Sequence, residues 1–136
     1  MILIETDVIL SSINIKDPKH YEAEKVLEKF SGKTLLSPYT LLEINLLIKS
    51  KLIKVKNTEL FWNEIGNMLA YYGIIILNTK PKYHSLAYSL REKYGLTYFD
   101  SLHAASAICE KVSLISYDSE YDKVTELNYV HPSNIV

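Results

Sequence analysis

Cysteine is nearly absent from this sequence, and the one that is present, Cys109, lies within an apolar helical pattern. A single cysteine excludes an intramolecular disulfide and any cluster of thiolate metal ligands. Glycine is also scarce, and the four glycines are too far apart to form a nucleophile elbow, a phosphate-binding loop or a dinucleotide fingerprint. The residues that support covalent catalysis or nucleotide hydrolysis are therefore missing.

Long apolar runs are missing as well. The longest, such as residues 74–77, are far shorter than the roughly 18 residues that a membrane span needs. The N-terminus lacks a basic segment followed by a long apolar stretch, and no linker rich in proline and glycine interrupts the 136 residues. We therefore expect a single domain over residues 1–136, in a soluble cytoplasmic protein that does not contact a membrane.

The formal net charge of −1 argues against a protein that coats polyanions, because such binding comes from clustered lysine and arginine. The charge is nevertheless unevenly distributed. The segment between Ile44 and Thr58 contains no acidic residue but carries Lys49, Lys51, Lys54 and Lys56. These lysines either make one edge of the molecule locally positive or form a solvated helix end that complements the helix dipole.

Strand-like apolar runs alternate with segments of helical period, which predicts an α/β fold with a mostly parallel sheet. We predict strands over 2–6, 34–36, 73–77 and 113–117, with a short last strand over 128–130, and we expect strand 73–77 to be buried. Helices are predicted from Asp17-Pro18 to Gly32, from Ser37-Pro38 to about Lys51, from Phe61 to Tyr72, from Tyr83 to Tyr94, and from Asp100 onward.

Four acidic residues lie in apolar segments, where a carboxylate is costly to desolvate unless its charge is compensated. Asp7 follows the first apolar run, Glu43 lies inside an apolar helix, Asp100 opens a helix of small residues, and Asp118 follows strand 113–117. Two of them are thus expected just beyond the carboxyl ends of strands, the edge at which open α/β sheets bind ligands. We expect all four to share one pocket at that edge.

Each of these acids also has a structural explanation. The pairs Thr40/Glu43 and Thr97/Asp100 have the spacing of a capping box, in which a carboxylate satisfies a free amide at a helix start. The other two acids suit helix caps or turns after strands. Glu43 fits a capping role less well, because Ser37-Pro38 already begins its helix.

Carboxylates that converge repel one another unless a cation neutralises them. Oxygen ligands of this kind suit Mg²⁺ or Mn²⁺. Zinc is disfavoured because the histidines form no ligand pair at short helical spacing, and His103, the one nearest an acid, is interpreted as structural or adjacent to substrate. The pattern therefore favours hydrolysis of a phosphodiester by water that a metal activates.

Four motifs, in this order, resemble those of the PIN domain, the nuclease family that includes the VapC toxins of bacterial and archaeal toxin–antitoxin pairs. They are the strand and acid of Glu5-Thr6-Asp7-Val8-Ile9-Leu10, the internal helix acid of Ser37-Pro38 through Glu43, the small-residue helix Asp100-Ser101-Leu102-His103-Ala104-Ala105-Ser106-Ala107, and the strand and acid of Leu114-Ile115-Ser116-Tyr117-Asp118. The resemblance covers nearly the whole chain.

The resemblance implies a three-layer α/β/α fold around a central parallel sheet and an endoribonuclease that depends on Mg²⁺ or Mn²⁺ and cleaves single-stranded RNA. It implies that the catalytic and metal-binding acids are Asp7, Glu43, Asp100 and Asp118, with Ser116 or Thr6 supporting them. It also implies two protein partners, because toxins of this family are commonly homodimers and are neutralised by an antitoxin whose peptide reaches the acidic site.

The last motif departs from the family pattern. Tyr121 stands where phenylalanine is usual, and Glu120 and Asp122 are additional acids. Any of the acids at 118, 120 and 122 could therefore meet the metal, and Asp118 is favoured because it directly follows the strand.

Aromatic residues suggest further contacts. Tyr39, Tyr98, Tyr117 and Tyr121 adjoin the acidic motifs and are candidates for stacking on unpaired bases. The run Leu60-Phe61-Trp62 places Trp62 either at a partner surface or in the core. Two other functions stay open: a PIN-fold binding module that has lost catalysis, and a receiver-like phosphoacceptor, although no lysine follows strand 113–117 as that chemistry requires.

Overall fold

The computed structural model describes residues 1–135, and within them the chain forms a five-stranded sheet with six helices around it. The strands are β1 (Ile2–Ile4), β2 (Thr34–Leu36), β3 (Ile75–Ile76), β4 (Ser113–Ile115) and β5 (Tyr129–Val130). The helices are α1 (Thr6–Ile13), α2 (His20–Lys29), α3 (Thr40–Lys49), α4 (Thr58–Tyr72), α5 (Pro81–Tyr94) and α6 (Tyr98–Glu110). Two short 3₁₀ turns complete it, Ser119–Lys123 and Pro132–Asn134.

The sheet order is β3-β2-β1-β4-β5, and each of its strand pairs is parallel. The mostly parallel sheet is thus confirmed. The chain builds β2 and β3 on one side of β1 and then crosses back to build β4 and β5 on the other side. This reversal leaves a crevice at the carboxyl ends of β1 and β4, where open α/β sheets bind ligands. A receiver-like fold has the order 2-1-3-4-5, so that interpretation is wrong.

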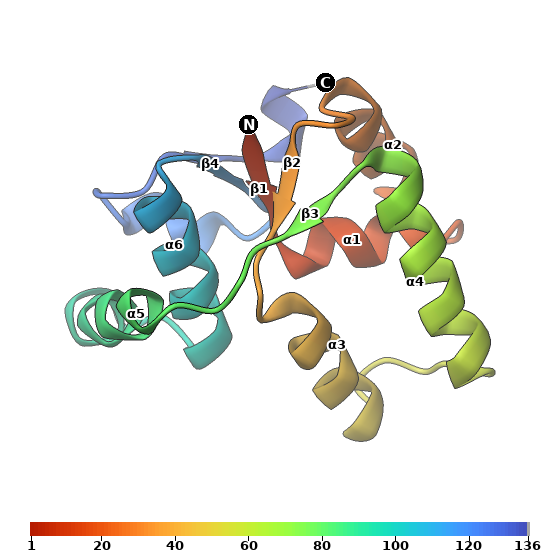
Figure 1. Ribbon diagram of the computed structural model, residues 1–136, viewed down its shortest axis with the longest axis horizontal. Coiled ribbons are helices and arrows are strands. Elements are labelled where there is room, and N and C mark those ends of the chain that lie inside the picture. The colour runs from red at the N-terminus through yellow and green to blue at the C-terminus, as the bar shows by residue number, and fades with distance from the viewer. Residues whose placement is uncertain (136) are drawn as a thin grey trace.

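Helices cover both faces of the sheet, as Figure 1 shows, which confirms the three-layer arrangement. Strand residues alternate between two apolar cores. Leu3, Leu35 and Leu114 pack beneath α5 and α6, whereas Ile4, Leu36 and their neighbours pack against the helices on the other face. Within the described residues, no helix is both long enough and apolar enough to cross a bilayer.

Several predictions about elements are wrong in detail. Helix α3 begins at Thr40 and not at Ser37-Pro38, α6 begins at Tyr98 and not at Asp100, and β4 ends at Ile115 and not at residue 117. The first strand ends at Ile4, not at residue 6, because Glu5 already caps α1, a helix that the sequence analysis did not assign. Strand β3 is not buried: Ile75 is 56% and Ile76 40% exposed, since β3 lies at the open edge of the sheet. The helix expected from Asp17 begins only at His20, after a turn held by the Asp17 carboxylate.

Two of the four tyrosines predicted to stack on unpaired bases are too buried to do so. Tyr39 is 6% exposed and Tyr121 is fully buried, so neither can stack on a base. Tyr98 is exposed and Tyr117 half-buried, so these two remain accessible, although Arg91 lies over the ring of Tyr98 and Lys19 over the ring of Tyr117. Trp62 is half-buried against the core beside Phe61, with ring centroids 5.4 Å apart, so it belongs partly to the core and partly to the surface.

Candidate metal centre

Glu5 is the acid at the centre of the site, and it is only 5% exposed. The main chain carries it straight from β1 into α1, where its Oε1 accepts a hydrogen bond of 2.9 Å from the Thr6 amide. Parallel pairing places Ile4 level with Ile115, so the next residue along β4, Ser116, meets Glu5 and donates to its Oε2 at 3.2 Å. The register of β1 and β4 therefore fixes this carboxylate at the crevice.

Asp7 lies one residue into the first turn of α1 and faces the same serine. Its Oδ2 accepts hydrogen bonds from the Ser116 hydroxyl at 2.9 Å and from the Tyr117 amide at 3.0 Å. Because one hydroxyl carries one proton, Ser116 serves either Asp7 or Glu5 at a given moment. The other Asp7 oxygen, Oδ1, is buried and has no hydrogen-bond partner among residues 1–135.

Glu43 reaches the crevice from α3. Its Oε1 accepts hydrogen bonds from Thr6 Oγ1 at 2.5 Å and from His103 Nε2 at 2.8 Å. Thr40 is the first residue of α3 and Tyr39 is its N-cap, so Glu43 makes no capping box with Thr40. Its partners are long-range side chains of α1 and α6, which indicates that Glu43 belongs to the site and does not cap its own helix.

Asp100 enters from the first turn of α6. The hydroxyl of the buried Tyr121 donates a hydrogen bond of 3.1 Å to its Oδ1. A phenylalanine could not make this contact, so the family departure at Tyr121 adds a donor to the site. Thr97 is the N-cap of α6, but within the described chain its side chain makes no capping hydrogen bond.

The three acids that follow β4, each a candidate metal ligand from the sequence, differ clearly in position. The Asp118 amide donates to Ser116 Oγ at 3.0 Å, and its Oδ1 accepts from the Glu120 amide at 2.9 Å, so Asp118 adjoins the site and also caps the turn that follows. Glu120 is exposed and pairs with Lys123 at 2.6 Å, and Asp122 is exposed as well. Position therefore favours Asp118 over the other two acids.

The electrostatics of the cluster oppose full ionisation. Burial, then the charges of Asp7, Glu43 and Asp100, raise the pKa of Glu5 well above its usual range. Burial also raises the pKa of Asp7 against the hydrogen bonds of Ser116 and Tyr117. For Asp100, burial raises the pKa, the charge of the nearby Asp118 raises it further, and the hydrogen bond from Tyr121 opposes this rise.

Glu43 is the exception. Burial pushes its pKa upward, but the hydrogen bonds from His103 and Thr6 lower the pKa below its ordinary value. One acid is thus held ionised by dedicated donors while its neighbours resist ionisation. This arrangement fits a site that is completed by a positive charge.

The donor set fits a divalent cation. One ligand atom each from Glu5, Glu43 and His103 lie within 4.8 Å of one another, and the orphaned Oδ1 of Asp7 offers a further oxygen that no protein donor satisfies. Carboxylate oxygens suit Mg²⁺ and Mn²⁺, whereas an imidazole ligand suits transition metals. The geometry thus supports a metal centre without fixing the ion.

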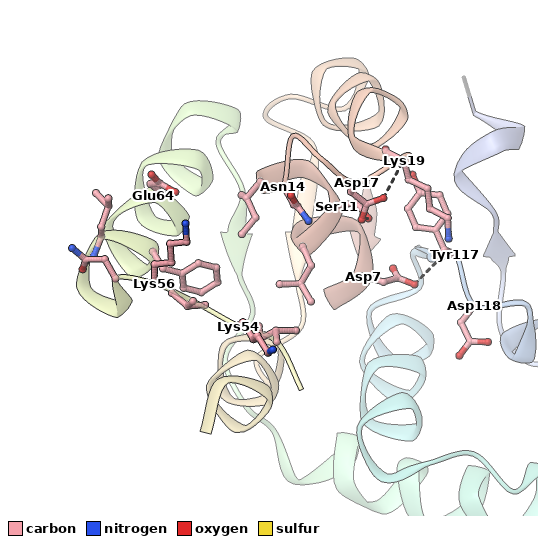
Figure 2. Close-up of a pocket in the computed structure, with 17 residues that line it drawn as sticks. Asp7, Ser11, Asn14, Asp17, Lys19, Lys54, Lys56, Glu64, Tyr117 and Asp118 are labelled. Carbon is pink, nitrogen blue, oxygen red and sulfur yellow. Dashed lines mark hydrogen bonds between the residues drawn. The ribbon is translucent and has the colours of Figure 1, made fainter. Parts of the chain in front are cut away.

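A groove of about 840 Å³ leads away from this cluster. Figure 2 shows Asp7 and Tyr117 on one side of it and Lys54 and Lys56 on the opposite side. Its lining includes the apolar residues Leu10, Ile13, Ile53, Val55, Leu60 and Phe61. Of the four lysines singled out in the sequence, Lys54 and Lys56 line the groove and Lys49 and Lys51 do not.

With this geometry established, the family can be stated. The model of the PIN domain matches residues 2–127, so the chain belongs to the PIN-domain family. This confirms the resemblance inferred from the four motifs. No curated protein matches the chain at a significant level.

Solved structures share the fold. A toxin–antitoxin complex from Klebsiella pneumoniae is 19% identical, with a TM-score of 0.72 over 97% of this chain and 98% of the other. VapBC2 from Rickettsia felis, bound to a DNA fragment from its promoter, is 22% identical, with a TM-score of 0.74 over 96% and 98%. PAE2754 from Pyrobaculum aerophilum is 15% identical, with a TM-score of 0.68 over 98% and 90%. At these identities the likeness establishes the fold.

Asp7 was predicted as a site residue from the sequence, but Glu5, the most buried acid of the cluster, was not. The predicted first strand reaches residue 6 and therefore includes Glu5. The available signal was the same one used for Asp118: an acid directly after an apolar run of strand length, here Ile2-Leu3-Ile4. His103 was noticed, but its contact with Glu43 joins residues 60 positions apart and could not be read from spacing.

The raised pKa values predict how stability depends on pH. A carboxyl group with a raised pKa in the folded state keeps a proton that the unfolded chain releases, so the free energy of unfolding falls as pH rises above about 4. We expect the Tm of the chelator-treated protein to fall by a few degrees between pH 5 and pH 7.5, and saturating Mg²⁺ to restore it. Differential scanning calorimetry measures both effects.

Two variants make this prediction specific. Glu5→Gln removes the group with the largest opposition to ionisation, so it should flatten the pH dependence and raise the Tm of the metal-free protein at pH 7.5. Glu43→Gln is the control, because the pKa of Glu43 is lowered and its ionised form stabilises the fold above pH 4. A pH dependence that Glu5→Gln leaves unchanged contradicts the account.

Proposed function

We propose that this chain is an endoribonuclease that depends on Mg²⁺ or Mn²⁺ and cleaves single-stranded RNA, and that it acts as the toxin of a VapBC-type toxin–antitoxin pair. The observation that carries the proposal is the convergence of four acids, from three separate segments, into one cluster in which burial and then the charges of Asp7, Glu43 and Asp100 raise the pKa of Glu5. Membership of the PIN-domain family supports the class of activity, since PIN domains are typically nucleases.

The proposed metal-binding and catalytic residues are Asp7, Glu43, Asp100 and Asp118, to which we add Glu5. A bound divalent cation would neutralise these acids, activate a water and stabilise charge on the phosphodiester. The protein orients each acid with a separate donor. Thr6 and His103 hold Glu43, Ser116 and the Tyr117 amide hold Asp7, and Tyr121 holds Asp100.

The groove supplies a path for the RNA strand on one side of the scissile phosphate. Lys54 and Lys56 can bind backbone phosphates, because they lie across the groove from Asp7. Tyr117 exposes part of its ring beside Lys19, whose Nζ lies 4.5 Å from the ring centroid. A lysine beside an accessible aromatic ring is a suitable surface for an unpaired nucleotide.

An antitoxin is the proposed protein partner. The Klebsiella structure is a toxin–antitoxin complex, and the Rickettsia structure is a VapBC pair on DNA. In this chain the groove is lined by apolar side chains together with acids, among them Asp7 and Glu64, and lysines, among them Lys19 and Lys56. Such a groove can hold a peptide that carries both charges, and a peptide seated there would exclude RNA.

The nuclease prediction is tested on purified protein freed of any partner. We expect it to cleave single-stranded RNA with Mg²⁺ or Mn²⁺, to leave duplex DNA intact, and to lose activity when a chelator is added. Asp7→Asn, Glu43→Gln and Asp100→Asn should each lower kcat at least about a hundredfold, because each removes a charge that holds the cation. Gel analysis of a labelled RNA measures the rates.

The three acids that follow β4 allow a matched comparison of variants. Asp118→Asn should impair cleavage, whereas Glu120→Gln and Asp122→Asn should leave it nearly unchanged, because both side chains point into solvent. Cleavage that survives chelation or the Glu43 variant would require a different mechanism. A chain that binds metal and RNA but leaves the RNA intact would be a binding module of the same fold.

The lysine prediction concerns binding, measured by fluorescence anisotropy of a labelled single-stranded RNA. Lys54→Ala and Lys56→Ala should each weaken binding and lower the slope of log affinity against log salt by about 0.7, the value for one lost contact with a single strand. Lys51→Ala is the control, because Lys51 carries the same charge on the same segment but lies outside the groove. Equal losses in all three variants would mean a diffuse charge effect.

A second copy of the chain is the other proposed partner. Ile75 and Ile76 leave an apolar patch on the open edge of β3, and an exposed edge strand readily pairs with another chain. We expect light scattering to show a dimer, and Ile75→Lys to raise its dissociation constant at least about tenfold. Leu52→Lys, at a side chain that is 76% exposed, should not affect the dimer. A monomeric wild type, or equal effects of both variants, contradicts the proposal.

A further inference from the structure

His103 is the side chain in the cluster whose role the proposed function leaves undecided. It is fully buried on α6, one turn after Asp100, and Phe99 stacks on it with ring centroids 6.4 Å apart. Its Nε2 faces oxygen atoms of three residues: Glu43 at 2.8 Å, Thr6 at 3.4 Å and Glu5 at 3.6 Å. By position alone, this nitrogen could either ligate a metal together with the two glutamates or donate a proton to one of them.

The other ring nitrogen distinguishes these roles. A histidine that ligates a metal through Nε2 carries its proton on Nδ1 and almost always donates it to a carboxylate, a carbonyl or a water. In His103, Nδ1 is buried and has no hydrogen-bond partner among residues 1–135. Metal ligation through Nε2 would therefore leave a buried N–H unpaired, which is rare in proteins.

The donor role avoids that problem. If Nε2 carries the proton, it gives Glu43 Oε1 a short hydrogen bond, and Nδ1 can keep only a lone pair, which is less costly to leave unpaired than an N–H. Thr6 donates to the same Oε1 at 2.5 Å. Both donors thus act on one oxygen of Glu43 and leave the second oxygen available.

From this geometry we infer that His103 is a positioning residue: its Nε2–H donates to Glu43, fixes which oxygen of that carboxylate faces the metal, and does not itself bind the ion. The inference rests on the proposed function, because it assigns a role within that metal centre. It predicts an all-oxygen site, and hence a preference for Mg²⁺ and Mn²⁺, although an imidazole lies within reach.

The direct test is long-range ¹H–¹⁵N NMR of ¹⁵N-histidine protein, which reports the proton on each ring nitrogen. We expect Nε2 of His103 to be protonated in the metal-free protein and to stay protonated at saturating Mg²⁺. Loss of the Nε2 proton when Mg²⁺ binds would show that His103 is a ligand and would overturn the inference. No substitution is needed, so a folding defect cannot obscure the result.

Three substitutions test whether the donor matters. Glutamine places an amide nitrogen near the position of Nε2, whereas asparagine places it nearer Nδ1, so only His103→Gln can replace the hydrogen bond to Glu43. We expect calorimetry to show Mn²⁺ binding within about threefold of wild type in His103→Gln and weakened about 10- to 100-fold in His103→Asn and His103→Leu. Circular dichroism checks that each variant is folded.

Equal Mn²⁺ affinity in all three variants and the wild type would overturn the inference, as would equal weakening in His103→Gln and His103→Asn. Failure of the proposed function would appear differently, as wild-type protein that binds neither Mg²⁺ nor Mn²⁺. The two ideas can therefore be rejected separately.

Discussion

The constraint on which the rest of this structure depends is the placement of several carboxylates where water cannot solvate them. Glu5 is almost completely buried, and the charges of Asp7, Glu43 and Asp100 act on it. The protein provides donors from Thr6, Ser116, Tyr121 and His103, yet the burial of Glu5, Asp7 and Asp100 still raises their pKa values. Buried acids that resist ionisation cost stability, so such a cluster is typical of a functional site.

The topology explains how residues so distant in sequence meet. Strands β1 and β4 are neighbours in the sheet although they lie far apart in the sequence, and their register sets Ile4 level with Ile115. That register brings Glu5 to Ser116, while α1 turns Asp7 toward the same serine. Helices α3 and α6 then add Glu43 and Asp100. A parallel sheet collects the ends of its strands at one edge, so a short segment after each strand suffices to build the site.

The fold was largely predictable from the sequence, because apolar runs and helix signals alternate clearly and the four motifs occur in order. The wrong predictions concern local features of the structure. Glu5 was missed because strand and helix join without a loop, and the burial of β3 was overestimated because an apolar run does not reveal whether its strand lies at an edge. The hydrogen bonds from His103 to Glu43 and from Tyr121 to Asp100 are tertiary contacts, which the spacing of residues in the sequence does not reveal.

The central claim is that this acidic cluster binds a divalent cation, and anomalous diffraction tests it most directly. Crystals grown with Mn²⁺ should show an anomalous peak within coordination distance of Asp7 Oδ1 and the free oxygen of Glu43, with Glu5 and Asp100 around it. A fully occupied Mn²⁺ elsewhere on the molecule, with this cluster empty at saturating concentration, would contradict the account.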